Sequence, residues 1–169
     1  MDAPRLPPEL AATLASAWLS LAGEPCAFTS LDAMPPRLPG DACFLLPVLR
    51  ADLREAGRVL LVLGDDDAHH LGASMFGLPL DELAPADVDD ANAELCNIFG
   101  SCVVKALDDS HELELGLPER TSVGHVEELC AGCPPRLTLA ATLGPRHVVV
   151  AYFEDDPLPP PSSKELRHG

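Results

Sequence analysis

Apolar side chains recur at helical spacing in three stretches of the chain. In the first stretch, which follows Pro7-Pro8, the recurring positions are Leu10, Leu14, Ala17, Trp18 and Leu21. Because proline is tolerated in the first turn of a helix, this pattern predicts a helix over Glu9 to Ala22. We expect two further helices, one near Asp67 to Phe76 and one at about Val88 to Leu107.

Five other stretches have the apolar character of β-strands. They are Ala42 to Leu49, Arg58 to Leu63, Glu112 to Leu117, Arg136 to Leu143 and His147 to Phe153. A turn near Ala56-Gly57 separates the first two, and Gly144-Pro145 joins the last two, as is typical of hairpins. Hairpins favour antiparallel pairing, so we predict an α+β fold in which helices pack on one face of an antiparallel sheet.

Length and proline content indicate how the chain is divided. A chain of 169 residues, 47% of them hydrophobic, suits one domain with a single core. Residues Ala33 to Gly40 are rich in proline and glycine and are predicted to form a loop. The end of the chain is rich in proline and serine, which is typical of disorder. We predict one domain over residues 1–154 and a disordered tail over residues 155–169.

The predicted helix from Val88 to Leu107 carries an ordered polar row. On a helical wheel an apolar stripe gathers Ala91, Leu95, Ile98 and Cys102, and Phe99, Val103 and Ala106 widen it. Offset by roughly a third of a turn lies a second stripe of Asp90, Glu94, Asn97 and Ser101. We expect the apolar stripe to be buried and the polar stripe to reach solvent. Glu94 and Asn97 then project side by side, one helical turn apart.

Spacing alone leaves a simpler interpretation open, because a Glu and an Asn on the polar face of a helix are usually only solvated. The stretch Gly57 to Val126, however, resembles the CheC/CheX/FliY family of chemotaxis phosphatases. The motif of that family is Asp or Ser, three residues, Glu, two residues, Asn, and later a Pro. Here it is Asp90, Glu94, Asn97 and Pro118, preceded by a strand-like run and a short acidic helix as in the family.

The resemblance implies a protein phosphatase that removes the aspartyl phosphate of a CheY-like response regulator, in chemotaxis or two-component signalling. By resemblance, Asn97 orients the attacking water and Glu94 pairs with the regulator's active-site lysine. An acyl phosphate is already activated, so the task is to position water, and an amide does so without a charge that repels phosphoryl oxygens. Asp90 supports the helix, and Pro118 shapes its loop. The chain needs no cofactor or metal, because the magnesium belongs to the regulator.

The first predicted helix bears on the number of sites. Ala12 stands three residues after Glu9, where a CheC-type second motif would place Asn. We therefore expect one site per chain, as in CheX-like members. The family also implies a homodimer joined through a sheet edge, which light scattering at micromolar concentration tests. The alternative function is a non-catalytic module that binds or sequesters a regulator, or a flagellar-switch-like interaction domain.

Charge and hydropathy exclude several classes of function. The formal net charge of −16 repels nucleic acid and anionic membranes, and there is no basic patch with interleaved aromatic residues. No apolar run reaches the length of a membrane span, and the N-terminus lacks the order of a signal peptide. We expect a cytoplasmic protein.

The cysteines and histidines suggest chemistry only weakly. Cys130 and Cys133 have the spacing of half a zinc site or a redox pair, but no second such pair exists. We expect all six cysteines to be reduced and structural, and a thiol switch at this pair is the alternative. His69-His70 follows the acidic run of residues 65–67, which we interpret as a helix start rather than a cation site.

Overall fold

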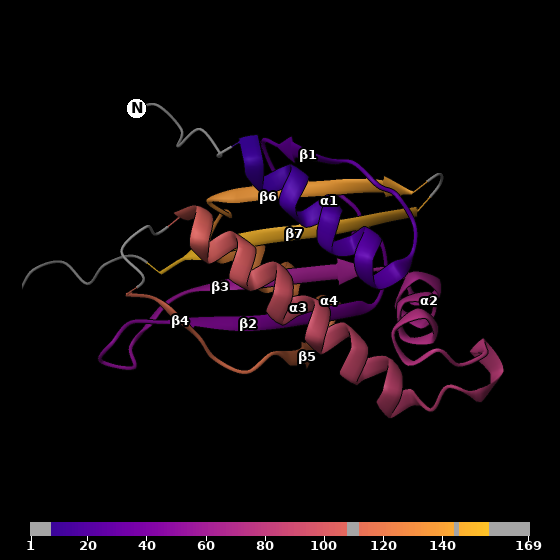
Figure 1. The fold of residues 1–169 in the computed structure, drawn as a ribbon. Helices are drawn as coiled ribbons and strands as arrows, with labels where there is room; N and C mark the ends of the chain where they lie inside the picture. Colours follow the sequence, from indigo (N-terminus) through magenta and orange to yellow (C-terminus); the bar gives the residue numbers. More distant parts are fainter. Residues whose placement is uncertain (1–7, 108–111, 144–145, 156–169) are drawn as a thin grey trace, which may run out of the picture.

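The computed structural model describes residues 8–107, 112–143 and 146–155 (Figure 1). Its helices are α1 (Pro8–Ala22), α2 (Asp65–Phe76), α3 (Pro85–Leu107) and α4 (Val123–Gly132), and a short 3-10 helix, η1 (Leu80–Glu82), lies between α2 and α3. Its strands are β1 (Phe28–Leu31), β2 (Ala42–Leu49), β3 (Glu55–Leu63), β4 (Glu114–Leu115), β5 (Glu119–Thr121), β6 (Leu137–Leu143) and β7 (Arg146–Glu154). The three predicted helices and the loop over residues 33–40 are confirmed.

The strands form one antiparallel sheet in the order β1-β6-β7-β3-β2, and both β4 and β5 pair with the outer side of β2. The predicted hairpins β2–β3 and β6–β7 are confirmed, as is the α+β class. The first hairpin turns earlier than predicted, because Arg50 N–H donates to the Arg54 carbonyl at 2.8 Å and Leu53 takes a left-handed φ of 66°. β3 therefore begins at Glu55, ahead of the predicted turn at Ala56-Gly57.

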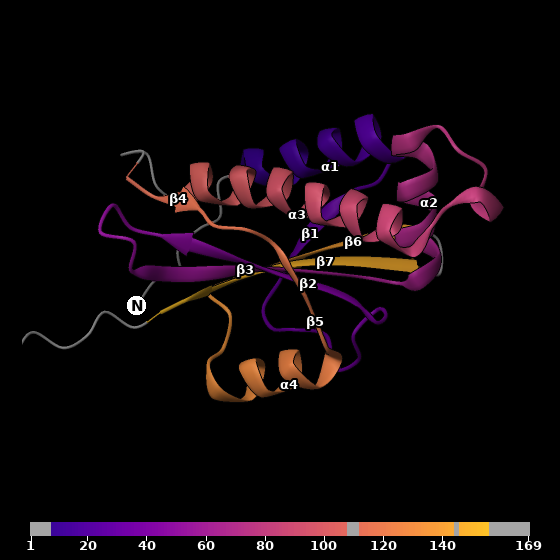
Figure 2. The same ribbon diagram turned by 90° about the horizontal axis from the view of Figure 1, so that it is seen from below.

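The sheet is covered on both faces (Figure 2). Helices α1, α2 and α3 lie on one face, as predicted, and α4 lies on the other face, where no helix was predicted. The reason is the apolar character of the second face, to which β2 and β3 contribute Cys43, Leu60 and Val62. Val126 of α4 is fully buried against this cluster. A short helix is thus sufficient to cover an apolar surface that would otherwise meet water.

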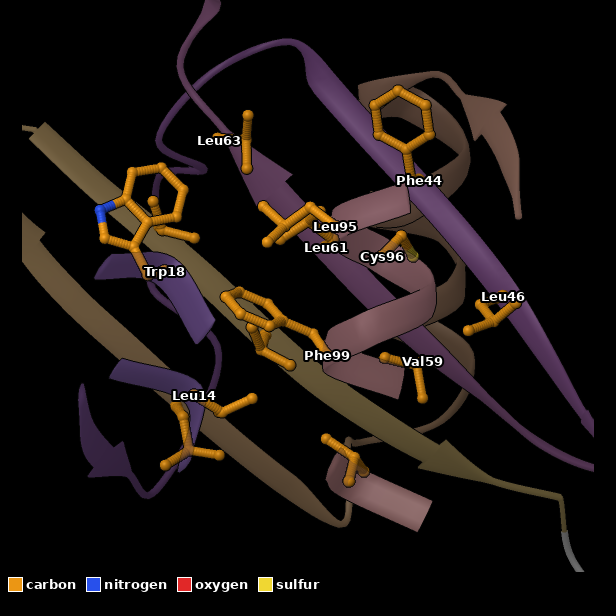
Figure 3. Packing of buried hydrophobic residues seen from close by; sticks show 14 of the residues in the cluster. Leu14, Trp18, Phe44, Leu46, Val59, Leu61, Leu63, Leu95, Cys96 and Phe99 are labelled. Atoms are coloured by element: carbon orange, nitrogen blue, oxygen red, sulfur yellow. The ribbon is translucent and has the colours of Figure 1, made fainter. Parts of the chain in front are cut away.

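The main core lies between the sheet and α1, α2 and α3 (Figure 3). Leu14 and Trp18 of α1 point into it, and Phe99 of α3 meets the ring of Phe28 edge-on, with ring centroids 5.7 Å apart and an interplanar angle of 89°. Val59 to Leu63 of β3 are all buried, because β3 is an inner strand whose two faces are both covered. This continuous apolar run is the strongest strand signal in the sequence.

The outer edge of β2 is paired by an interrupted strand. The predicted strand Glu112 to Leu117 is reduced to β4, and β5 follows after a gap of three residues. Within this gap Gly116 N–H donates to the Pro47 carbonyl at 2.8 Å. Pro118 has no N–H to offer a neighbouring strand, which explains why regular pairing stops.

Two predictions fall wholly or partly outside the described residues. They are the proline- and serine-rich tail beyond Asp155 and the Gly144-Pro145 connection. In the described ranges, no helix has both the length and the apolar character needed to cross a membrane.

Candidate functional site on helix α3

Helix α3 begins three residues before its predicted start. Pro85 is its first residue, where a missing N–H costs no helical hydrogen bond. The Asp87 carboxylate accepts a hydrogen bond from Ala84 N–H at 3.0 Å, and a negative charge in the first turn is favourable to the helix dipole. Asp90, expected near the helix start, lies instead in the second turn. Pro85 and Asp87 were the sequence signals for this earlier start.

The buried face of α3 is rotated from the predicted stripe. Ile98, Cys102 and Ala106 are only partly buried, whereas Asn92 and Cys96, outside that stripe, are completely buried. Asn92 is tolerated inside because its side-chain amide donates to the Ala68 carbonyl at 3.1 Å and to the Val88 carbonyl at 2.7 Å. A polar residue gives no periodic hydrophobic signal, so the sequence pattern did not indicate that Asn92 lies in the core. There its side chain ties α3 to α2.

Gly100 lets α3 approach the sheet closely. A Cβ atom at this position would lie 2.3 Å from Leu46 Cδ2 of β2, well inside van der Waals contact. Leu46 is completely buried and has little room to move. The close approach fixes the height of α3 above the sheet and with it the direction in which the opposite face points.

The polar row faces outward, as predicted. Asp90 and Glu94 are exposed, and Asn97 and Ser101 are half-buried. None of these four side chains has a hydrogen bond or ion pair with another residue in the described ranges, so their polar groups are available to a partner. An acid and an amide one turn apart on a rigid helix can together hold a cation and orient a water molecule.

The fourth motif residue, Pro118, lies beside α3 rather than on it. It is half-buried in the segment between β4 and β5, and both strands contact α3. Asp89, which precedes the row, is ion-paired and hydrogen-bonded to Arg120 of β5. The two residues are far apart in the chain, so no local pattern could have indicated this pair. It fastens the segment that contains Pro118 to the flank of α3.

Two cavities in the described part of the chain lie away from the row. A cavity of about 520 Å³ near the β2–β3 turn is lined by Arg50, Arg136 and Tyr152, among others. A second, of about 170 Å³, lies between α2, α3 and Arg120. Neither is lined by Glu94 or Asn97. In the described part of the chain, no group of three or more His, Cys, Asp or Glu side chains could hold a metal ion.

All six cysteines are free in the structure, and their reduced state stays a prediction. Burial raises the pKa of the Cys96 thiol to about 12. Burial, and then the charge of Glu127, raises the pKa of Cys130, which lies in the last turn of α4, and so disfavours a reactive thiolate there.

The acidic run of residues 65–67 forms the first turn of α2, as predicted, although the N-cap is Gly64 rather than an aspartate. The Nδ1 atom of His69 lies 2.8 Å from the Asp65 carbonyl oxygen, within the same turn.

No protein-family model matches the sequence, and no curated protein matches it. Solved structures do match. The crystal structure of the chemotaxis protein CheX from Vibrio vulnificus is 11% identical, with a TM-score of 0.61 over 88% of this chain and 97% of that chain. The crystal structure of the CheX-CheY-BeF3-Mg complex from Borrelia burgdorferi gives 12% identity and a TM-score of 0.60, covering 86% of this chain and 95% of that chain.

A flagellar protein also matches. The FliM middle domain from H. pylori is 10% identical, with a TM-score of 0.56 over 86% of this chain and 85% of that chain. Identities this low show the fold alone. The resemblance found in the sequence is thus confirmed at the level of the fold, and the chain has the fold of the CheX- and CheC-like chemotaxis proteins, which the FliM middle domain shares.

Proposed function

We propose that this chain is a phosphatase for the aspartyl phosphate of a CheY-like response regulator. The observation that carries the proposal is the pair Glu94 and Asn97, which stand one turn apart and unpaired on the outward face of a long, firmly packed helix. A face of this kind can enter another protein's active site, whereas a substrate pocket would enclose a small molecule. The CheX fold, known also from a complex with CheY, supports the same partner class.

In the proposed reaction, Asn97 holds a water molecule in line with the phosphorus atom. The water oxygen forms a bond to phosphorus while the bond between phosphorus and the aspartyl oxygen breaks. The products are inorganic phosphate and the regulator's free carboxylate, and the water's protons leave with the phosphate or pass to solvent. Alignment of this kind contributes much of the acceleration in reactions of activated groups. The magnesium ion, which neutralises phosphoryl oxygens, is expected on the regulator.

Glu94 has a separate role in the proposal. The outward face of α3 is acidic, with Asp87 in the first turn followed by Asp90 and Glu94. Carboxylates beside a phosphoryl group repel it unless a cation lies between them. A lysine from the regulator would supply that cation, so Glu94 aligns the two proteins while Asn97 acts on the water.

The decay of phosphorylated regulators from the same genome tests the proposal. Wild-type protein in substoichiometric amount should accelerate the decay of at least one regulator, and Asn97→Ala should lose about 100-fold in kcat, the loss expected when a positioning group is removed. Ser101→Ala is the matched control, because Ser101 lies one turn further along the same row and has no assigned role. Equal activity of wild type and Asn97→Ala would overturn the mechanism.

The second candidate function is a non-catalytic interaction module, and the likeness to the FliM middle domain favours it. The same experiment separates the two candidates. A regulator that binds the wild-type chain with no faster decay of its phosphate would identify a binding module. A cytoplasmic location, a single domain with a disordered tail, and a homodimer joined through a sheet edge belong to the proposal as further predictions.

A further inference from the structure

Leu117 is an exposed leucine in a segment whose two flanking strands, β4 and β5, contact α3. Its side chain is 80% exposed, the largest value among the large hydrophobic residues in the described ranges. It lies between Gly116 and Pro118, in the segment that connects β4 to β5. A side chain this exposed contributes little to the core and is free to contact another protein.

The backbone around Leu117 is held on both sides. Before it, Leu115 of β4 pairs with Val48, and after it β5 pairs with residues 43–45 of β2. Gly116 packs against the Pro47 ring, to which a Cβ atom at this position would approach within 3.3 Å, and it also hydrogen-bonds the Pro47 carbonyl. Pro118 fixes its own φ angle. The leucine is therefore displayed by a rigid segment.

This segment runs along the side of α3 that carries Asn97. The Arg120–Asp89 ion pair fastens it near the start of the row. Further along the helix, Leu115 of β4 lies close to Gly100. Its Cδ2 atom is 3.6 Å from the position that a Cβ atom would take at this glycine. At 100° per residue, Asn97 lies about 60° around the helix from Gly100, on the solvent side. Figures 1 and 2 show the chain between β4 and β5 passing beside α3.

We propose that Leu117 is the apolar anchor through which the chain selects its response regulator. The inference rests on the proposed function, because the partner that covers Leu117 is the receiver domain docked on Glu94 and Asn97. That receiver must present a cation to the acidic row and, beside it, an apolar depression that accepts the leucine. The charge of the row supports a receiver domain as the partner, since Asp90 and Glu94 have no basic partner within the described chain and can accept a cation from it.

The test compares Leu117→Ala with Leu53→Ala. Leu53 is 74% exposed, but it lies in the β2–β3 turn, so replacing it with alanine should leave Kd and KM for the regulator unchanged. Receiver domains from the same genome, free and loaded with beryllofluoride, are titrated for Kd, and the phosphorylated forms are used for kcat and KM. Leu117→Ala should raise Kd and KM for the preferred regulator about tenfold and leave kcat within twofold, because an anchor outside the reacting atoms contributes uniform binding.

The outcomes separate this inference from the proposed function. If wild-type protein accelerates the decay of the regulator's phosphate and Leu117→Ala leaves KM unchanged, then Leu117 is not an anchor, but the proposed phosphatase activity stands. If a receiver binds without faster decay of its phosphate, and Leu117→Ala weakens that binding, then Leu117 is an anchor, but the chain is not a phosphatase. No binding to any receiver would overturn both. A change of molecular mass in Leu117→Ala by light scattering would assign Leu117 to a contact between two copies of this chain and overturn the anchor.

Discussion

Replacing Phe99 with alanine tests the packing that orients the polar row. Phe99 is completely buried, two residues from Asn97 on the opposite face of α3, and its ring contacts that of Phe28. The substitution removes the buried ring and leaves a cavity, which together cost about 3–5 kcal/mol. Since domains usually have about 5–15 kcal/mol of stability, the variant should fold with a much reduced margin.

The chain contains a built-in reporter for this measurement. Trp18 is its single tryptophan and is 2% exposed in the same core, so its fluorescence follows unfolding in urea. At a slope of about 2 kcal/mol per molar urea, the unfolding midpoint of Phe99→Ala should fall by roughly 1.5–2.5 M. In a double-mutant cycle with Phe28→Ala, the coupling free energy should be about 0.5–1.5 kcal/mol.

Phe76→Ala is the matched control, because Phe76 is 48% exposed at the end of α2. It should lose less than about 1 kcal/mol. If Phe99→Ala loses no more stability than Phe76→Ala, then the Phe99 face of α3 is not the core face, and the outward direction assigned to Glu94 and Asn97 fails with it.

Two further predictions concern buried polar groups. Asn92→Ala should lower the free energy of unfolding by about 1–3 kcal/mol in the same urea assay, because the Ala68 carbonyl loses its side-chain donor; an unchanged midpoint would refute this. Cys96 stays neutral in the folded state up to its pKa of about 12, whereas the unfolded thiol ionises from about pH 9. The free energy of unfolding should therefore fall above pH 9 by up to about 1.4 kcal/mol per pH unit, and in Cys96→Ala it should fall less steeply. The same dependence on pH in both proteins would contradict the burial of this thiol.

The elements that sequence analysis found are those with long, uniform patterns. The 23-residue α3 has many repeats of its apolar spacing, and the inner strand β3 has an unbroken apolar run. The Glu94–Asn97 row followed from the same periodicity, because helical spacing fixes which side chains share a face. The exposure of Asp90 and Glu94 could therefore be predicted from the sequence.

The missed elements are short or polar. Helix α4 has ten residues and a single completely buried side chain, Val126. Its sequence therefore contains too few apolar repeats to indicate a helix. The one local signal was Ser122, whose hydroxyl accepts a hydrogen bond from His125 N–H at 3.1 Å. Strand β1 has four residues, of which only Phe28 is buried. The contact between Asp89 and Arg120 depends on the tertiary fold, which no local pattern specifies.

The interrupted strand beside β2 also limits how copies of the chain can assemble. β4 and β5 are short and contain Glu114, Glu119 and Arg120, and Pro118 stands between them. Short, charged, proline-broken edges are poor templates for a further strand. At the other end of the described sheet, β1 pairs only with β6. Pairing of β1 with the β1 strand of a second copy, about a twofold axis, would use the one remaining edge of each described sheet. Strand pairing between copies of this chain would therefore stop at two copies instead of growing into a fibre.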